Sequence, residues 1–294
     1  MVSLEEGLTE SRTDEMNKWG RTQIYPRMRT LLGEQRGIVL DLVNHGLAMV
    51  DDELDSDSPK QLGHYQQMFR QSYSGITIQA STPAEQAVTN LGYALRRLVS
   101  APFLHFRDRA IGKHTYQEVL NFWDIEERNF QRKGQILDRA TLEEINLGIG
   151  ALVASQFLYI FDSPRVYNEF TQLARAYGLA VKLADNLCDY REDIQDGFVN
   201  IPKEEIYQVR GISIENDRII GVDSAKLGLS PEYVEREHER IKQVFDSADR
   251  LMLVARARRP VWSRKTDEAL NLFGEFCHTW LEQANDFVEK QAKH

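Results

Sequence analysis

The spacing of apolar residues is the feature that most constrains the fold of this chain. Apolar side chains recur at intervals of three and four along almost the whole sequence, which places them on one face of an α-helix. The sequence shows no alternating, strand-like segment and no repeat of fixed period. It therefore predicts an all-α fold.

Breaks rich in serine, glycine and proline divide this pattern into separate helices. Helices are expected over residues 24–50, 61–72, 83–99, 116–131, 141–161, 166–194, 231–257 and 266–290. The break at 195–230 is too long for a plain connection, and loops of that length are usually functional or disordered. It is predicted to form a flap or loop, with a domain boundary as the alternative.

Composition excludes several classes of function. The 294 residues are 42% hydrophobic, which is ample for a buried core, and the net charge of −9 argues against a nucleic-acid partner. The longest apolar run, 147–161, is shorter than the roughly 20 residues that span a bilayer, so no integral membrane segment is predicted and peripheral contact is left open. The polar start and two cysteines predict a cytoplasmic protein, while the oligomeric state stays open.

Acidic residues recur at four-residue spacing within one predicted helix, at Asp185, Asp189 and Asp193. Residues four apart on an α-helix share a face, so these carboxylates form a column about two turns long. Their mutual repulsion costs free energy that a bound cation offsets. Oxygen ligands favour Mg²⁺ over zinc, with Mn²⁺ as the alternative ion. The column is predicted to bind metal; a solvated acidic helix face is the alternative.

A second acidic cluster, residues 51–55, follows the largely apolar run 37–50. It is expected at the end of a helix, with Asp51 and Asp55 again four apart. Two acidic helix faces far apart in sequence predict one cavity that holds metal ions between its walls and a diphosphate as the guest. For this cluster taken alone, an acidic loop before Pro59 is the alternative.

Both acidic segments resemble a known family. DDELD at 51–55 resembles the aspartate-rich motif of class I isoprenoid synthases, and residues 188–206 resemble the second acidic segment of squalene and phytoene synthases. Residues 176–187 resemble the helix that leads into that segment. The matching positions in that segment are Asp189, Glu192, Asp193, Gly197, Pro202 and Glu204. The resemblance implies a single isoprenoid-synthase helical bundle around a deep apolar pocket, over 23–294, after a polar segment at 1–22.

The resemblance and the chemistry of prenyl diphosphates together assign roles to individual residues. The predicted metal ligands are Asp51, Asp52, Asp55, Asp185, Asp189 and Asp193, of which Asp51, Asp55, Asp189 and Asp193 are also predicted to be catalytic. Cations near the metal helix, at Lys182, Arg191 and Lys203, are predicted to bind diphosphate. Aromatic rings stabilise a nearby carbocation by about 0.5–2 kcal/mol each. Phe122, Phe157, Tyr159 and Phe161 are predicted to line the pocket, with plain core packing as the alternative.

Departures from the family pattern narrow the expected reaction. Lys182 and Asp185 stand where the family usually has glutamine and asparagine, and Cys188 replaces an arginine. Residues 47–50 also lack the arginine that usually precedes the first aspartate motif. Fewer cations imply that one prenyl diphosphate binds rather than two.

The expected function is therefore a Mg²⁺-dependent terpene synthase that ionises one prenyl diphosphate and then cyclises, deprotonates or hydrates the carbocation. The main alternative is a head-to-head prenyl transferase that condenses two such substrates. A family member without catalysis and an unrelated helical, metal-dependent hydrolase are weaker alternatives. Substrate chain length and product skeleton are not predicted.

Overall fold

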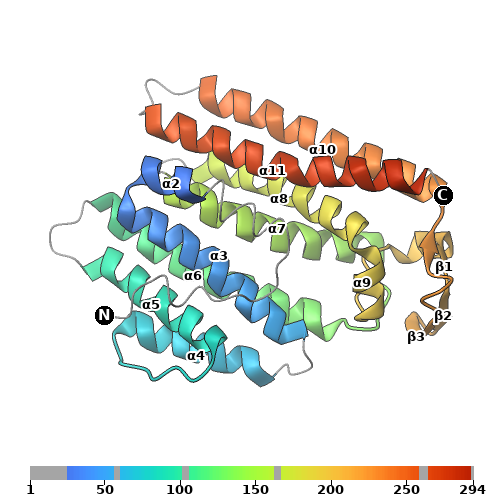
Figure 1. Ribbon diagram of the computed structural model, residues 1–294, viewed down its shortest axis with the longest axis horizontal. Helices are drawn as coiled ribbons and strands as arrows, with labels where there is room; N and C mark the ends of the chain where they lie inside the picture. The colour runs from blue at the N-terminus through green and yellow to red at the C-terminus, as the bar shows by residue number, and fades with distance from the viewer. Residues whose placement is uncertain (1–24, 56–59, 101–105, 162–166, 258–263, 293–294) are drawn as a thin grey trace. The chain divides into compact units, whose positions relative to one another are not determined.

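The computed structural model describes residues 25–55, 60–100, 106–161, 167–257 and 264–292, and this part of the chain is mostly helical (Figure 1). The all-α prediction is confirmed. The predicted polar segment 1–22 lies outside the described residues. The elements are α2 (Tyr25–Leu32), α3 (Glu34–Asp55), α4 (Lys60–Ser74), α5 (Pro83–Ser100), α6 (Phe106–Gln131), α7 (Arg139–Phe161), α8 (Tyr167–Cys188), α9 (Tyr190–Gln195), η3 (Lys203–Gln208), β1 (Val209–Arg210), β2 (Ile212–Glu215), β3 (Arg218–Val222), β4 (Gly228–Leu229), α10 (Pro231–Ala257) and α11 (Arg264–Gln291).

Helix boundaries follow local chemistry. α5 and α10 begin at a proline, whose missing N–H costs nothing in the first turn. Asp138 caps α7, because its Oδ1 accepts a hydrogen bond from the Thr141 N–H at 2.8 Å. The expected first helix is interrupted at Gly33, which has a φ of 83°, and then continues to Asp55. α6 begins ten residues before its expected start, and the expected helix 166–194 is divided into α8 and α9.

The sequence prediction of no strands is wrong for part of the segment 195–230. β2 pairs with β3 in an antiparallel hairpin, and β1 pairs with β4. Asn216 and Asp217 form the tight turn of the hairpin with φ values of 50° and 59°. A two-residue turn of this kind requires positive φ at both positions, which asparagine and aspartate tolerate. The strands are too short for their alternation to stand out from the helical pattern.

The chain divides into two compact units. Unit 1 takes in the described residues up to Glu127, those within 155–170 and α11 up to Phe276. Unit 2 takes in 128–154, 171–257 and α11 from Cys277. α6, α7, α8 and α11 contribute residues to both units. The expectation of a single domain stays a prediction.

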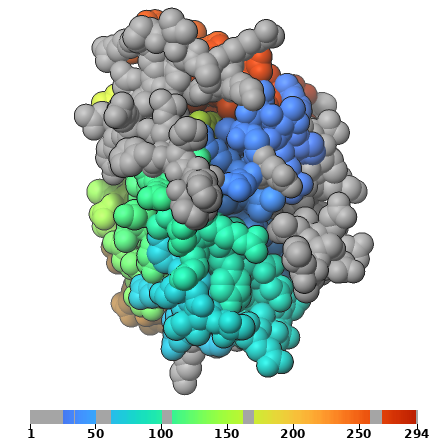
Figure 2. Space-filling view, turned by 90° about the vertical axis from the view of Figure 1, so that its left-hand side faces the viewer, coloured from blue at the N-terminus to red at the C-terminus, as the bar shows by residue number. Residues whose placement is uncertain are grey.

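In unit 1, α5 packs against both α3 and α4. Figure 2 shows α4 and α5 side by side, in cyan and teal, on one face of the molecule. Their close approach depends on Gly92, because an added Cβ would lie 1.9 Å from Ser72 Oγ and 3.0 Å from the Phe69 carbonyl oxygen. The Phe69 ring packs edge-on against buried Trp123 on α6, with centroids 5.2 Å apart.

In unit 2, α7 and α8 meet at two glycines. A Cβ on Gly150 would lie 2.1 Å from the carbonyl oxygen of Gly178, and the reverse distance is the same. One helical turn before Gly150, the side chain of Asn146 accepts a hydrogen bond from Asn186 Nδ2 at 3.2 Å. The backbones of the two helices are therefore in direct contact, which fixes the end of α8 that carries the acidic residues.

α7 is long and apolar enough to cross a membrane by length and composition. However, 61% of the most apolar stretch of α7 is buried within the protein. Burial of this kind is typical of a core helix in a globular domain.

Candidate functional site: an acidic column on α8 and α9

The acidic column, Asp185, Asp189 and Asp193, runs across the junction of α8 and α9. The helix assignment is interrupted at Asp189, whose φ is −95° and ψ is 9°. The backbone hydrogen bonds nevertheless continue through the junction. The Asp189 N–H donates to the Asp185 carbonyl at 2.9 Å, and the Asp193 N–H donates to the Asp189 carbonyl at 2.9 Å. The four-residue spacing therefore brings these residues together as predicted.

The three carboxylates influence one another electrostatically. Burial, followed by the negative charges of Asp185 and Asp193, raises the pKa of Asp189 to about 7, even though part of the Asp189 side chain is exposed. Burial raises the pKa of Asp193 to about 6 as well. Carboxyl groups in such a position hold protons more tightly than usual because ionisation brings negative charges together. A divalent cation would relieve the same repulsion.

Two neighbouring side chains already contact the column. Lys182 Nζ lies 2.8 Å from Asp185 Oδ2, one helical turn away on α8. Asn200 Nδ2 donates a hydrogen bond to Asp193 Oδ2 at 2.7 Å. The charge of Arg132 also lowers the pKa of Asp193, against the effect of burial. The ends of the column are thus held in place, while Asp189 lies between them.

The residues of the column fit a hard divalent cation in their chemistry. Their donors are carboxylate oxygens, and after burial the negative charges of Asp185 and Asp193 contribute to the raised pKa of Asp189. Within the described residues, however, no group of three acidic, histidine or cysteine side chains is arranged closely enough to hold a metal ion by itself. Mg²⁺ commonly uses one or two carboxylates and completes its shell with water and phosphate oxygens. The column therefore suits a metal that arrives together with a phosphate ligand.

The first acidic cluster ends a helix, as predicted, since α3 runs to Asp55. The side chains of Asp51, Asp52 and Asp55 lie outside the part of the structure that can be described. This cluster belongs to unit 1 and the acidic column to unit 2. That the two acidic faces share one cavity therefore stays a prediction.

The three basic residues predicted to bind diphosphate are in different environments. Lys182 pairs with Asp185 within α8. Arg191 is exposed, and its guanidinium lies 5.5 Å from the ring centroid of Tyr190. Lys203, on η3, lies 2.5 Å from Asp217 of the hairpin turn. Of the three, Lys182 is the one that the structure places beside the column.

The four predicted pocket aromatics are all buried in unit 1. Phe157 and Phe161 lie one turn apart on α7, and both rings approach Phe273 of α11, with centroids 6.3 Å away. Tyr159 points elsewhere, and its ring centroid lies 3.6 Å from that of His114 on α6. Phe122, also on α6, is 5% exposed. The α7 aromatics thus pack on two different neighbours, so their joint role in a pocket stays a prediction.

The chain that follows the column is anchored at a buried arginine. Arg132 is 6% exposed, and its guanidinium donates to the Val199 carbonyl at 3.0 Å and to Asn200 Oδ1 at 2.6 Å. Gly197, with a φ of 92°, makes the turn that brings these residues back. Sequence reasoning missed Arg132 and Asn200, because their contact joins positions 67 to 68 residues apart and no motif marks it.

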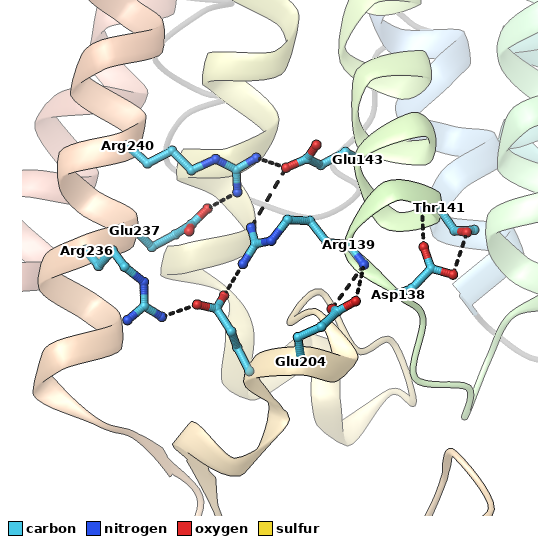
Figure 3. Close-up of polar contacts among 9 residues, drawn as sticks. Asp138, Arg139, Thr141, Glu143, Glu204, Arg236, Glu237 and Arg240 are labelled. Carbon is cyan, nitrogen blue, oxygen red and sulfur yellow. Dashed lines mark hydrogen bonds and ion pairs between the residues drawn. The ribbon is translucent and has the colours of Figure 1, made fainter.

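A second anchor is a network of charges around η3, which sequence reasoning also missed (Figure 3). Glu205 pairs with Arg139 of α7 and with Arg236 of α10. Arg240 pairs with Glu143 at 2.6 Å and with Glu237 at 2.9 Å. The first part of the predicted flap is therefore tied to two helices by ion pairs.

A small cavity lies beside Asn200 in unit 2, and its walls include Asn186, Tyr190 and Glu237. It has room for roughly one water molecule. A prenyl chain does not fit there. The deep apolar pocket implied by the family resemblance is thus a different feature, and it stays a prediction.

The sequence matches no protein-family model and no curated protein sequence. Among solved structures, the chain is similar to a single-substitution variant of cucumene synthase, with a TM-score of 0.52 and 15% sequence identity. The match covers 93% of this chain and 88% of that chain. At this level of identity the similarity establishes the fold. The chain therefore has an all-α fold similar to that of cucumene synthase.

Proposed function

We propose that this protein is a Mg²⁺-dependent terpene synthase that ionises one prenyl diphosphate. The observation that carries the proposal is the acidic column, in which burial and mutual repulsion raise the pKa values of Asp189 and Asp193 to about 7 and about 6. Such a column costs free energy in the absence of a cation. Its occurrence in a fold similar to that of cucumene synthase favours the use of this site for a metal-bound diphosphate.

In the reaction, the bond between the allylic carbon and the diphosphate oxygen breaks, and the electron pair leaves with the diphosphate. Mg²⁺ bound at the column would supply the positive charge that stabilises this leaving group. Lys182 lies beside the column and would add a further positive charge. The carbocation then cyclises, loses a proton or captures water.

The small number of positive charges near the column favours the binding of one diphosphate rather than two. Lys203 is engaged by Asp217 at 2.5 Å, so Lys182 is the one predicted diphosphate-binding residue that the structure places beside the column. Cys188, where the family has an arginine, is half-buried, and burial with the negative charges of Asp189 and Asp185 raises the pKa of its thiol to about 12. A neutral thiol offers a second diphosphate no positive charge.

The test is incubation of the protein with C10, C15, C20 and C25 prenyl diphosphates and Mg²⁺, with products identified by mass spectrometry. We expect products with the carbon number of the substrate, released diphosphate, and complete loss of both on chelation. Asp189→Asn should lower turnover by orders of magnitude, because it removes the middle carboxylate of the column. Glu235→Gln is the matched control, since Glu235 is an exposed acid on α10 that lies outside both acidic motifs.

Two outcomes contradict this proposal. A C30 product from the C15 substrate, or a C40 product from the C20 substrate, identifies a head-to-head prenyl transferase. Turnover that survives both chelation and Asp189→Asn shows that the column does not take part in the chemistry.

A further inference from the structure

Asn200 connects a carboxylate of the acidic column to a buried arginine. Its Nδ2 donates to Asp193 Oδ2 at 2.7 Å, and its Oδ1 accepts from Arg132 Nη2 at 2.6 Å. A guanidinium can only donate and an ionised carboxylate can only accept, so these two neighbours fix the orientation of the amide. Asn200 therefore has one defined arrangement, in which each end of its side chain is used.

The arginine is itself held firmly at the end of α6. Arg132 Nε donates to Asn129 Oδ1 at 2.7 Å, and Nη1 donates to the Val199 carbonyl at 3.0 Å. The planar guanidinium thus has partners in two directions besides Asn200, and its central carbon lies 5.7 Å from the ring centroid of Phe198. A guanidinium fixed in this way restricts the position of the Asn200 side-chain amide, to which it donates a hydrogen bond.

The backbone between Asn200 and the column is also anchored. The Phe198 N–H donates to the Asp193 carbonyl at 2.7 Å, and the Gly134 N–H donates to the Gly197 carbonyl at 2.7 Å. The segment from Gly197 to Asn200 therefore lies against both the end of α9 and the residues that follow Arg132. Asn200 reaches Asp193 from a fixed backbone.

We propose that Arg132 and Asn200 are positioning residues that hold the Asp193 carboxylate in the orientation in which it binds a divalent cation. The inference rests on the proposed function, since it concerns the same metal site. Partners behind a metal ligand restrict its rotamers, so less conformational entropy is lost when the metal binds.

The experiment measures the binding of Mn²⁺ in the presence of inorganic diphosphate, from the electron paramagnetic resonance signal of free Mn²⁺. Asn200→Leu removes the link while keeping a side chain of similar size, and we expect it to weaken Mn²⁺ binding about tenfold. Arg132→Lys should weaken binding in the same direction, because an ammonium cannot replace the guanidinium fork. The combination of both changes should cost little more than Asn200→Leu alone, since they act on one carboxylate.

Lys133→Met is the matched control. Lys133 Nζ lies 5.5 Å from the centroid of the same Phe198 ring that Arg132 approaches, and the change removes a positive charge from the same segment. We expect its Mn²⁺ affinity to equal that of the wild type. Circular dichroism and thermal unfolding establish that each variant is folded at the assay temperature. If an Arg132 variant does not fold, the test rests on Asn200→Leu.

The decisive arm repeats Asn200→Leu in an Asp193→Asn background. If the link acts through Asp193, the second change has no further effect on Mn²⁺ affinity there. An equal tenfold loss in both backgrounds overturns the proposal, and so does wild-type Mn²⁺ affinity in Asn200→Leu. Failure of the proposed function has a different signature, in which the wild-type protein itself binds no Mn²⁺ with diphosphate and forms no product.

Discussion

The two halves of α7 are packed by opposite means. In unit 2, the half that contains Asn146 and Gly150 meets α8 at glycines, where the two helix backbones touch. In unit 1, the half from Ser155 to Phe161 fills its surroundings with aromatic rings. One helix can therefore hold the acidic column by close backbone contact at one end and build an apolar core at the other. The packing of the first half requires glycines that lack a Cβ, whereas the packing of the second half requires bulky aromatic rings.

The largest effect is expected when a single methyl group is added to the first half. In Gly150→Ala the new Cβ would overlap the Gly178 carbonyl, so the helices must separate, and we expect a loss of about 4 kcal/mol in unfolding free energy. Gly63→Ala is the matched control, because Gly63 is an exposed helical glycine with no atom near its would-be Cβ. That change should stabilise the protein by about 0.5–1 kcal/mol. Urea unfolding measures both; equal effects would refute the close contact.

Removal of a ring from the second half should have a smaller effect. Phe157 is 3% exposed and packs against Phe273 and Phe276, so Phe157→Ala leaves a cavity and should cost about 3 kcal/mol. Phe157→Leu, which keeps most of the volume, should cost clearly less. If both variants unfold at the same urea concentration as the wild type, the ring does not belong to a packed core. A prenyl-chain analogue that protects Phe157→Ala but not Phe157→Leu would connect this region to substrate binding.

The smallest expected effect concerns the pH dependence of stability. It tests the packing around Tyr159 in the second half of α7. Burial lowers the pKa of His114, whose ring lies tilted against that of Tyr159, to about 4 from an unfolded value near 6.5. A group whose folded pKa is depressed stabilises the fold above its unfolded pKa and loses that contribution as pH falls toward the folded value. We therefore expect the wild type to lose about 2–3 kcal/mol relative to His114→Gln between pH 6.5 and 4. The difference between the two proteins should be constant above pH 7; a difference that grows there would contradict the burial of a neutral imidazole.

Local features of this fold could be predicted from the sequence, whereas long-range partners could not. Helical spacing and the positions of Pro83 and Pro231 located most helices within a few residues. The four-residue spacing of the acidic column survives even where the helix is interrupted at Asp189, because the backbone hydrogen bonds continue. Each of these depends on residues within one or two turns of one another.

The missed features join distant parts of the chain. Arg132 contacts Asn200, and Arg139 contacts Glu205, yet each residue taken alone looks like an ordinary surface residue. The predicted pocket aromatics illustrate the same limit. A sequence shows that Phe157 and Tyr159 are two residues apart, but which neighbour each ring meets depends on helices elsewhere in the chain.

The ion pair between Lys182 and Asp185 means that the acidic column already contains a competitor for an incoming metal. A divalent cation that takes Asp185 as a ligand must exchange this ammonium, so the apparent affinity includes the free energy of breaking the pair. A partly exposed pair of this kind is worth up to about 1 kcal/mol, or roughly a fivefold change in affinity. The displaced ammonium would then favour a neighbouring anion, and metal and diphosphate would each strengthen the binding of the other.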